Sequence, residues 1–138
     1  MGAMPFTYSR TVRFADTDAA GVVFFANYLA FCHEAYEESL AASGIELKEF
    51  FQNTGVVVPI TRSEAEYLRP LVPGEKLRIT VVPELLSTNS YAVRFEIYKL
   101  KPVEKLAARI RTEHVATSPA THARLDLPTV LAAWVDAG

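Results

Sequence analysis

Asp16, Asp18 and Gly21 are the residues whose types and spacing best suit chemistry, and they lie in a short, otherwise largely apolar segment. The segment joins an apolar stretch to a long amphipathic stretch. A carboxylate held there would lie close to the unpaired backbone N–H groups of a helix start. It can direct a water molecule or attack a carbonyl, and such N–H groups stabilise an oxyanion. The segment therefore favours hydrolytic chemistry over a purely structural loop.

Two other interpretations of this segment are a calcium-binding loop and a purely structural turn. Asp16, Asp18 and Gly21 match positions 1, 3 and 6 of a calcium-binding EF-hand loop, but position 5 is Ala20 and position 12 is Asn27, where a bidentate Glu is required. The calcium match therefore fails, and Gly21 is better explained by a turn with positive φ. The spacing alone leaves open that both aspartates only accept hydrogen bonds from turn N–H groups.

The elements that must position this segment follow from the hydrophobic periodicity. Apolar residues recur at intervals of three and four between residues 27 and 43, which predicts a helix that Gly44 can end. Period-two alternation predicts strands, one of which contains Pro59 and is therefore expected at an edge or a bulge. The expected strands are 6–14, 56–68, 76–86, 91–97 and 106–118, and shorter helical segments are expected at 47–52 and 128–135.

The order of these elements predicts an α+β fold. One strand and one long helix precede about four consecutive antiparallel strands, and the helix must bury its apolar side on one face of the sheet. We expect an antiparallel sheet of about five strands wrapped around one long central helix, in a single domain over residues 1–138. One helix cannot cover both faces of such a sheet, which leaves room for packing between subunits.

Composition narrows the classes of function. The net charge of −2 argues against a nucleic-acid-binding surface, and no apolar run reaches the ~18 residues of a membrane span. Cys32 is the only cysteine, so we expect a buried thiol, no intramolecular disulfide and a reducing compartment, the cytoplasm. His114 and His122 lack metal-ligand spacing, so neither a metal nor a cofactor is expected.

Residues 16–28, followed by residues 31–37, resemble the hotdog-fold acyl-CoA thioesterases of the 4-hydroxybenzoyl-CoA type. The stretch Cys-His-Glu-Ala-Tyr-Glu at residues 32–37 is most similar to the cyanobacterial 1,4-dihydroxy-2-naphthoyl-CoA hydrolases, which act in phylloquinone synthesis. The resemblance implies a hotdog fold and hydrolysis of an aryl acyl-CoA thioester. Two alternatives remain open: a thioesterase for another aryl- or fatty acyl-CoA, and a domain that binds an acyl thioester without cleaving it.

The resemblance also implies roles for particular residues. Asp18 corresponds to the catalytic carboxylate, whereas Asp16 and Gly21 support the turn. The backbone N–H of Phe25 corresponds to the group that polarises the thioester carbonyl. Several related enzymes have a histidine where this chain has Phe25, which favours an aromatic-acyl substrate. His33 is expected either to bind a hydroxyl of the acyl group or simply to pack on its helix.

The resemblance implies partners as well. The substrate is an acyl-CoA, and the family builds each site across two subunits, so we expect a homodimer or homotetramer in which residues 56–68 contribute to the neighbour's site. The CoA group would be held by basic side chains such as Arg62, Arg94 or Arg109, among which the sequence does not choose.

Overall fold

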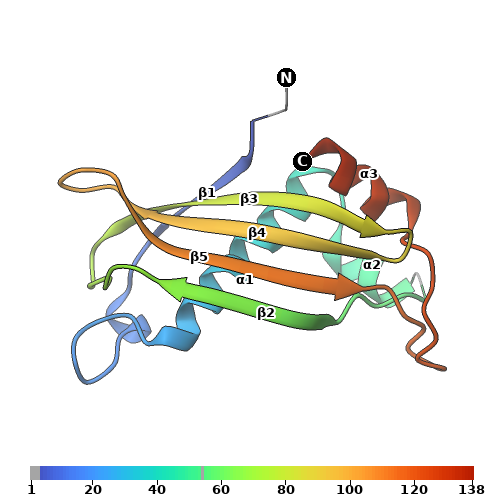
Figure 1. Ribbon diagram of the computed structural model, residues 1–138, viewed down its shortest axis with the longest axis horizontal. Helices are drawn as coiled ribbons and strands as arrows, with labels where there is room; N and C mark the ends of the chain where they lie inside the picture. The colour runs from blue at the N-terminus through green and yellow to red at the C-terminus, as the bar shows by residue number, and fades with distance from the viewer. Residues whose placement is uncertain (1–3, 54) are drawn as a thin grey trace.

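The structure is a computed structural model that describes residues 4–53 and 55–138. Five antiparallel strands form one sheet in the order β1-β3-β4-β5-β2 (Figure 1). The elements are β1 (Phe6–Thr11), the short 3-10 helix η1 (Phe14–Asp16), α1 (Phe25–Ala42), α2 (Leu47–Asn53), β2 (Ile60–Tyr67), β3 (Lys76–Ser87), β4 (Ser90–Lys99), β5 (Lys105–Val115) and α3 (Thr129–Ala137). The predicted α+β order, with one long helix against an antiparallel sheet, is confirmed.

Helix α1 runs across one face of the sheet and packs one side of the helix against it (Figure 1). Its buried residues recur at intervals of three and four, as the periodicity predicted: Tyr28, Phe31, Cys32, Ala35, Tyr36, Ser39 and Leu40. Gly44, with a φ of +92°, follows the end of the helix, and the Ser43 N–H turns back to the carbonyl of Leu40. The helix was predicted over residues 27–43. It begins two residues earlier and ends one residue earlier than predicted.

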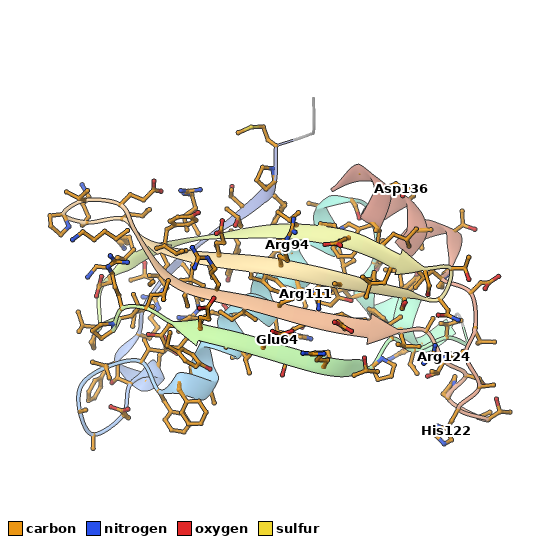
Figure 2. The ribbon with its side chains drawn as sticks, viewed as in Figure 1. Glu64, Arg94, Arg111, His122, Arg124 and Asp136 are labelled. Atoms are coloured by element: carbon orange, nitrogen blue, oxygen red, sulfur yellow. The ribbon has the colours of Figure 1, made fainter. Side chains whose placement is uncertain are left out.

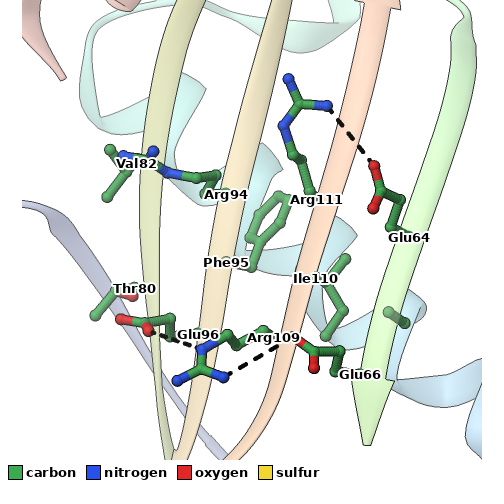
Figure 3. A pocket seen from close by; sticks show the side chains of 11 residues that line it. Glu64, Glu66, Thr80, Val82, Arg94, Phe95, Glu96, Arg109, Ile110 and Arg111 are labelled. Carbon is green, nitrogen blue, oxygen red and sulfur yellow. Dashed lines mark ion pairs between the residues drawn. The ribbon is translucent and has the colours of Figure 1, made fainter.

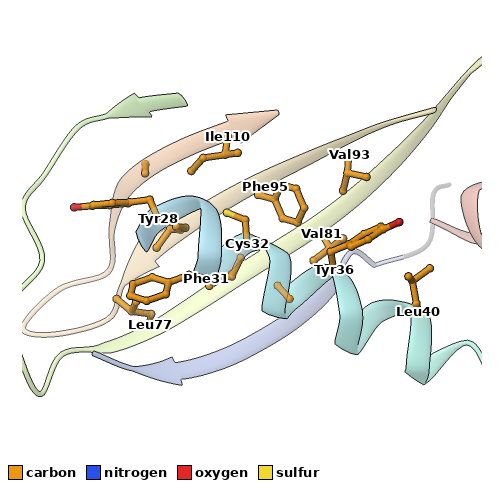
Figure 4. Packing of buried hydrophobic residues seen from close by; sticks show 14 of the residues in the cluster. Tyr28, Phe31, Cys32, Tyr36, Leu40, Leu77, Val81, Val93, Phe95 and Ile110 are labelled. Carbon is orange, nitrogen blue, oxygen red and sulfur yellow. The ribbon is translucent and has the colours of Figure 1, made fainter. Parts of the chain in front are cut away.

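The face of the sheet that meets α1 carries the apolar core. Leu77, Ile79 and Val81 alternate along β3 with residues that face away, and Val93, Phe95 and Ile110 continue the same layer on β4 and β5 (Figure 4). Each such fully buried side chain contributes about 1.5–3 kcal/mol through removal of apolar surface from water. This layer therefore fixes α1, and with it the loop that enters α1, on the sheet.

The opposite face of the sheet is charged. Glu64, Arg94 and Arg111 lie on strands β2, β4 and β5 and point away from α1 (Figure 2). This face has no helix over it among the described residues. The ion pairs on this face decide which basic side chains remain available to a ligand.

Two predicted strand boundaries are wrong for identifiable reasons. The first strand was expected to continue to residue 14, but it ends at Thr11 because the chain turns into η1, and Phe14 is exposed rather than packed. The second was expected to begin at residue 56, but β2 begins at Ile60 because Pro59 offers no N–H to the ladder. A register shift follows Ile60 in its pairing with β5.

Helix α3 closes the far end of the core. Its Trp134 donates from Nε1 to Ser39 Oγ on α1 (2.9 Å), and the indole contacts the rings of Tyr36 and Tyr91. The short terminal helix carrying Trp134 was predicted and is confirmed. No helix in the described part of the chain is long and apolar enough to cross a membrane.

Candidate active site

The Asp-rich segment forms a tight loop between η1 and α1. Gly21 has a φ of +79°, a conformation that residues with a side chain rarely adopt, so the turn predicted at this glycine is present. The Asp18 N–H donates to the carbonyl of Val22 (2.9 Å), and the Gly21 N–H donates to that of Asp18 (3.0 Å). Thr17 pairs with Val23 across the loop. Asp18 therefore lies at the tip of a closed, hydrogen-bonded loop.

The Asp18 side chain is exposed and only partly engaged. Its Oδ1 accepts a hydrogen bond from the Ala20 N–H (2.8 Å). Within residues 4–53 and 55–138, Oδ2 has no hydrogen-bond partner, and no basic side chain forms an ion pair with this carboxylate. One oxygen of Asp18 is thus held and the other is available to a water molecule or a carbonyl carbon.

The Asp16 side chain is engaged from several directions. Its Oδ2 accepts from Arg10 Nη1 and from the Arg13 N–H, both at 2.7 Å. Its main-chain oxygen accepts from the Phe24 N–H (3.0 Å) and from Asn27 Nδ2 (2.8 Å). Burial raises the pKa of Asp16, but the hydrogen bonds and charges of Arg10 and Arg13 outweigh it, so the pKa lies below its ordinary value. Asp16 joins η1 to the start of α1.

Phe25 is the first residue of α1, and its N–H has no partner inside the helix. Among the described residues it donates to no other backbone carbonyl. The positive end of the helix dipole lies at the same place. A carbonyl oxygen that gains negative charge would be stabilised there. The structure thus brings the loop of Asp16, Asp18 and Gly21 next to the helix start, as the sequence predicted.

His33 lies two turns further along α1, roughly 12 Å from Phe25 at 1.5 Å per residue. Its Nδ1 is 3.1 Å from Glu37 Oε1, and its side chain is 54% exposed. Its Nε2 has no hydrogen-bond partner in the described part of the chain. The ring lines two adjoining cavities of about 340 and 300 Å³, which Tyr36, Ile60 and His114 also line.

Sequence analysis missed a buried polar cluster at the inner wall of these cavities. His114 on β5 is stacked between the rings of Tyr91 (4.8 Å) and Tyr36 (5.2 Å). Its Nδ1 is 3.1 Å from the Val58 carbonyl, which can only accept, so Nε2 accepts from the Thr112 hydroxyl (3.0 Å). Burial lowers the pKa of His114, and the nearby His33 lowers it further. The hydrogen bond to Val58 raises the pKa, but the net shift is downward. His114 is therefore a neutral imidazole in a fixed tautomer.

The opposite face of the sheet holds a cavity of about 530 Å³ that contains no residue of the Asp-rich loop (Figure 3). Its arginines already have carboxylate partners: Arg109 lies between Glu96 (3.8 Å) and Glu66 (3.9 Å), and Arg111 is 4.0 Å from Glu64. The other two candidates for CoA binding are paired as well, Arg94 with Glu84 (3.5 Å) and Arg62 with Glu64 (3.2 Å).

Neither Cys32 nor a metal-binding cluster among the described residues provides a reactive group at this site. Cys32 is buried, as predicted, and burial raises the pKa of its thiol well above the ordinary value, so it is a packed side chain rather than a nucleophile. No group of three His, Cys, Asp or Glu side chains that could hold a metal ion occurs among residues 4–53 and 55–138.

The fold and the loop together define the class of protein. A five-stranded antiparallel sheet against one long helix, with an aspartate loop at the helix start, is the architecture of hotdog-fold thioesterases. A 1,4-dihydroxy-2-naphthoyl-CoA thioesterase from Synechocystis superimposes with a TM-score of 0.90 at 28% identity, covering 96% of both chains. Over residues 12–135 the sequence matches the thioesterase-like superfamily, and the chain belongs to this family.

Two relatives narrow the comparison further. The 1,4-dihydroxy-2-naphthoyl-CoA hydrolase of Nostoc punctiforme is 44% identical over 133 residues, which cover 96% of this chain and 88% of the relative. The hydrolase of the same name from Thermosynechococcus vestitus is 44% identical over 128 residues, covering 93% of this chain and 86% of the relative. The family that the Asp-rich segment indicated is thereby confirmed.

Proposed function

We propose that this chain hydrolyses 1,4-dihydroxy-2-naphthoyl-CoA to 1,4-dihydroxy-2-naphthoate and CoA. One observation carries the proposal: Asp18 offers a free carboxylate oxygen beside the start of α1, in a chain 44% identical to two hydrolases of that name. An exposed aspartate in a rigid loop beside unpaired helix N–H groups suits acyl transfer to water.

The chemistry follows from these two groups. The thioester carbonyl oxygen would accept a hydrogen bond from the Phe25 N–H, which stabilises the negative charge that develops there. Asp18 would either take a proton from the attacking water or attack the carbonyl carbon itself. The tetrahedral intermediate then expels CoA as its thiolate. With Asp18 as the base, this step gives the free acid directly. With Asp18 as the nucleophile, it gives an Asp18–acyl anhydride, which water hydrolyses to the acid and the Asp18 carboxylate. A thioester is already activated, so this route needs no serine triad.

The acyl group would extend from Phe25 along α1 towards His33. The two cavities that His33 lines, of about 340 and 300 Å³, lie in the range of small-molecule sites and combine apolar walls with a few polar groups. His33 Nε2 is available for a ring hydroxyl, because Nδ1 is directed to Glu37. These features support an aromatic, hydroxylated acyl group.

We infer that the active unit is a homodimer or homotetramer, at least a dimer, assembled through β2. Strand β2 is at the edge of the sheet, and among the described residues it pairs with no strand other than β5. Its Ile60 and Tyr67 are 48% and 45% exposed, and Phe25 beside Tyr67 is 60% exposed. Apolar side chains along an unpaired edge strand favour pairing with a second copy.

We also infer that the enzyme works in the cytoplasm, in phylloquinone biosynthesis. The product named by the relatives' activity, 1,4-dihydroxy-2-naphthoate, carries the naphthalene ring that a naphthoquinone requires. The chain's only cysteine is buried as a thiol, which suits a reducing compartment.

The test is a panel of CoA thioesters assayed for release of free thiol. The proposal predicts the highest kcat/KM with 1,4-dihydroxy-2-naphthoyl-CoA, and lower values with 2-naphthoyl-CoA, benzoyl-CoA and palmitoyl-CoA. A preference for another thioester would replace the acyl assignment. Tight binding without thiol release from any thioester would instead make the chain a non-catalytic binder.

A further inference from the structure

Arg10 lies on β1, but its side chain reaches two other elements. Its Nη1 donates to Asp16 Oδ2 on η1 (2.7 Å), and its Nε donates to Glu34 Oε1 on α1 (2.8 Å). The same Glu34 oxygen accepts a hydrogen bond from the Tyr8 hydroxyl (2.9 Å). The guanidinium carbon lies 4.0 Å from the centre of the Phe31 ring. One side chain thus connects β1, η1 and α1.

Arg10 and Asp16 are mostly shielded from water, whereas the Glu34 side chain is 39% exposed. The Arg10 side chain is 17% exposed and that of Asp16 is 15% exposed. Burial lowers the pKa of Arg10, but the hydrogen bonds and charges of Asp16 and Glu34 outweigh it, so the pKa lies above its ordinary value. Arginine suits the position because its planar fork serves two carboxylates at once, whereas the point charge of a lysine does not.

Asp16, one of the two carboxylate partners of Arg10, forms hydrogen bonds with residues at both ends of the loop that carries Asp18. The Asp16 carboxylate also accepts from the Arg13 N–H before the loop, and its main-chain oxygen accepts from Phe24 and Asn27 after the loop. Without the guanidinium, a largely buried carboxylate would lose its charge partner at the point where the two ends meet.

We propose that Arg10 is a positioning residue for thioester hydrolysis: it fixes the Asp16 turn against α1, so that Asp18 and the Phe25 N–H converge on one carbonyl group. The inference rests on the proposed function, because it takes Asp18 to act on a thioester. A misplaced catalytic group lowers kcat while leaving most substrate contacts intact, so the effect belongs in kcat rather than in KM.

The test compares Arg10→Met, Arg10→Lys and a matched control, Arg78→Met, with the wild-type enzyme on 1,4-dihydroxy-2-naphthoyl-CoA. Arg78, on β3, resembles Arg10 because it pairs with Glu104 and its guanidinium carbon lies 4.6 Å from the Tyr98 ring centre. These two contacts reach only β4 and the loop after β4. We expect Arg10→Met to lower kcat about tenfold to hundredfold. We expect KM to change by less than about twofold, because substrate contacts remain. Arg78→Met should keep wild-type kcat and KM.

A double variant separates positioning from general loss of structure. If Arg10 acts through Asp18, then Arg10→Met should cost nothing further, within about twofold, once Asp18→Asn has removed the positioned group. A full additional loss in the double variant would overturn the positioning role. If Arg10→Met fails to fold by circular dichroism, Arg10→Lys carries the same kcat and double-variant tests.

Failure of this inference differs from failure of the proposed function. Wild-type kcat in Arg10→Met, or a raised KM with unchanged kcat, would overturn the positioning role while Asp18→Asn still abolished turnover. Normal turnover in Asp18→Asn, or no thiol release by the wild-type enzyme, would overturn the proposed function itself.

Discussion

Asp16 and Asp18 lie two residues apart but have opposite surroundings. The carboxylate oxygens of Asp16 accept hydrogen bonds from Arg10 and from the Arg13 N–H, whereas Asp18 Oδ2 has no partner in the described part of the chain. A group that takes a proton from water or attacks a carbonyl needs an unoccupied lone pair. These surroundings support our proposal that Asp18 is the reacting group and that Asp16 orders the loop, a distinction that the bare Asp-x-Asp spacing left open.

The residues of the proposed site differ in whether their neighbours in the sequence reveal them. Asp16, Asp18 and Gly21 could be proposed as site residues because a turn glycine and two carboxylates lie within one short segment before a helix. Phe25 was indicated by the family resemblance, because the periodicity placed the helix start at residue 27. Arg10 could not be predicted in this way, because its contacts with Asp16 and Glu34 depend on the packing of β1, η1 and α1, which no local pattern describes. A signal was nevertheless present, because a charged residue on the otherwise apolar face of a predicted strand requires a partner.

At the same scale, His33→Ala should lower kcat/KM for 1,4-dihydroxy-2-naphthoyl-CoA by ~1–3 kcal/mol, the cost of losing a hydrogen bond to a buried group. The loss should be much smaller for 2-naphthoyl-CoA, which has no ring hydroxyl. His122→Ala, in an exposed loop, is the matched control and should change neither value. Equal losses on both substrates would mean that His33 only packs on α1.

At the scale of elements, periodicity located the five strands and the three α-helices but not η1, and the errors arose where the chain changes direction. Residues 12–14 continue an alternating pattern, but η1 begins at Phe14, and no periodicity reveals a short 3-10 turn stabilised by the side chain of Arg10. Conversely, Pro59 marked the irregular start of β2, although not its register shift. The stacking of His114 between Tyr36 and Tyr91 depends on pairing between strands and on the docking of α1, which the sequence pattern does not encode locally.

Strand β5 carries a pH-dependent contribution to stability through His114. Its pKa in the folded chain lies below the ordinary 6.5, so the unfolded chain takes up a proton first as the pH falls. The contribution is complete above pH 6.5 and is lost as the pH falls towards the folded-state pKa. We expect the free energy of unfolding, measured in urea, to fall across this range in the wild type and to fall less steeply in His114→Asn. Parallel slopes in the two proteins would contradict the assignment.

At the scale of the molecule, one face of the sheet is covered by α1 and the other carries ion pairs. In the described single chain, the outer edge of strand β2 faces no other strand, and Phe25 next to this edge is exposed. Helix α1 cannot cover this edge, because it already lies across the inner face (Figure 1). The architecture therefore favours assembly along β2, next to the proposed acyl cavities.

Replacing Tyr67 at this edge with lysine should shift the protein towards monomers, because it places a charge in the expected interface. Val103→Lys, in the exposed loop between β4 and β5, is the control and should leave assembly unchanged. Sedimentation velocity at micromolar concentration reports both variants. A wild-type protein that is monomeric and fully active would contradict the role of assembly.

Hydrolysis by the Asp18 carboxylate beside the start of α1 is most directly tested by the thiol-release rate of Asp18→Asn with 1,4-dihydroxy-2-naphthoyl-CoA. The substitution keeps the shape of the side chain and removes its charge, and the Asn oxygen can still accept from Ala20. We predict that kcat falls by ~10²–10⁴, the usual effect of losing a general base, with unchanged thermal unfolding. A folded Asp18→Asn enzyme with near-normal turnover would contradict the account and make Asp16 the next candidate.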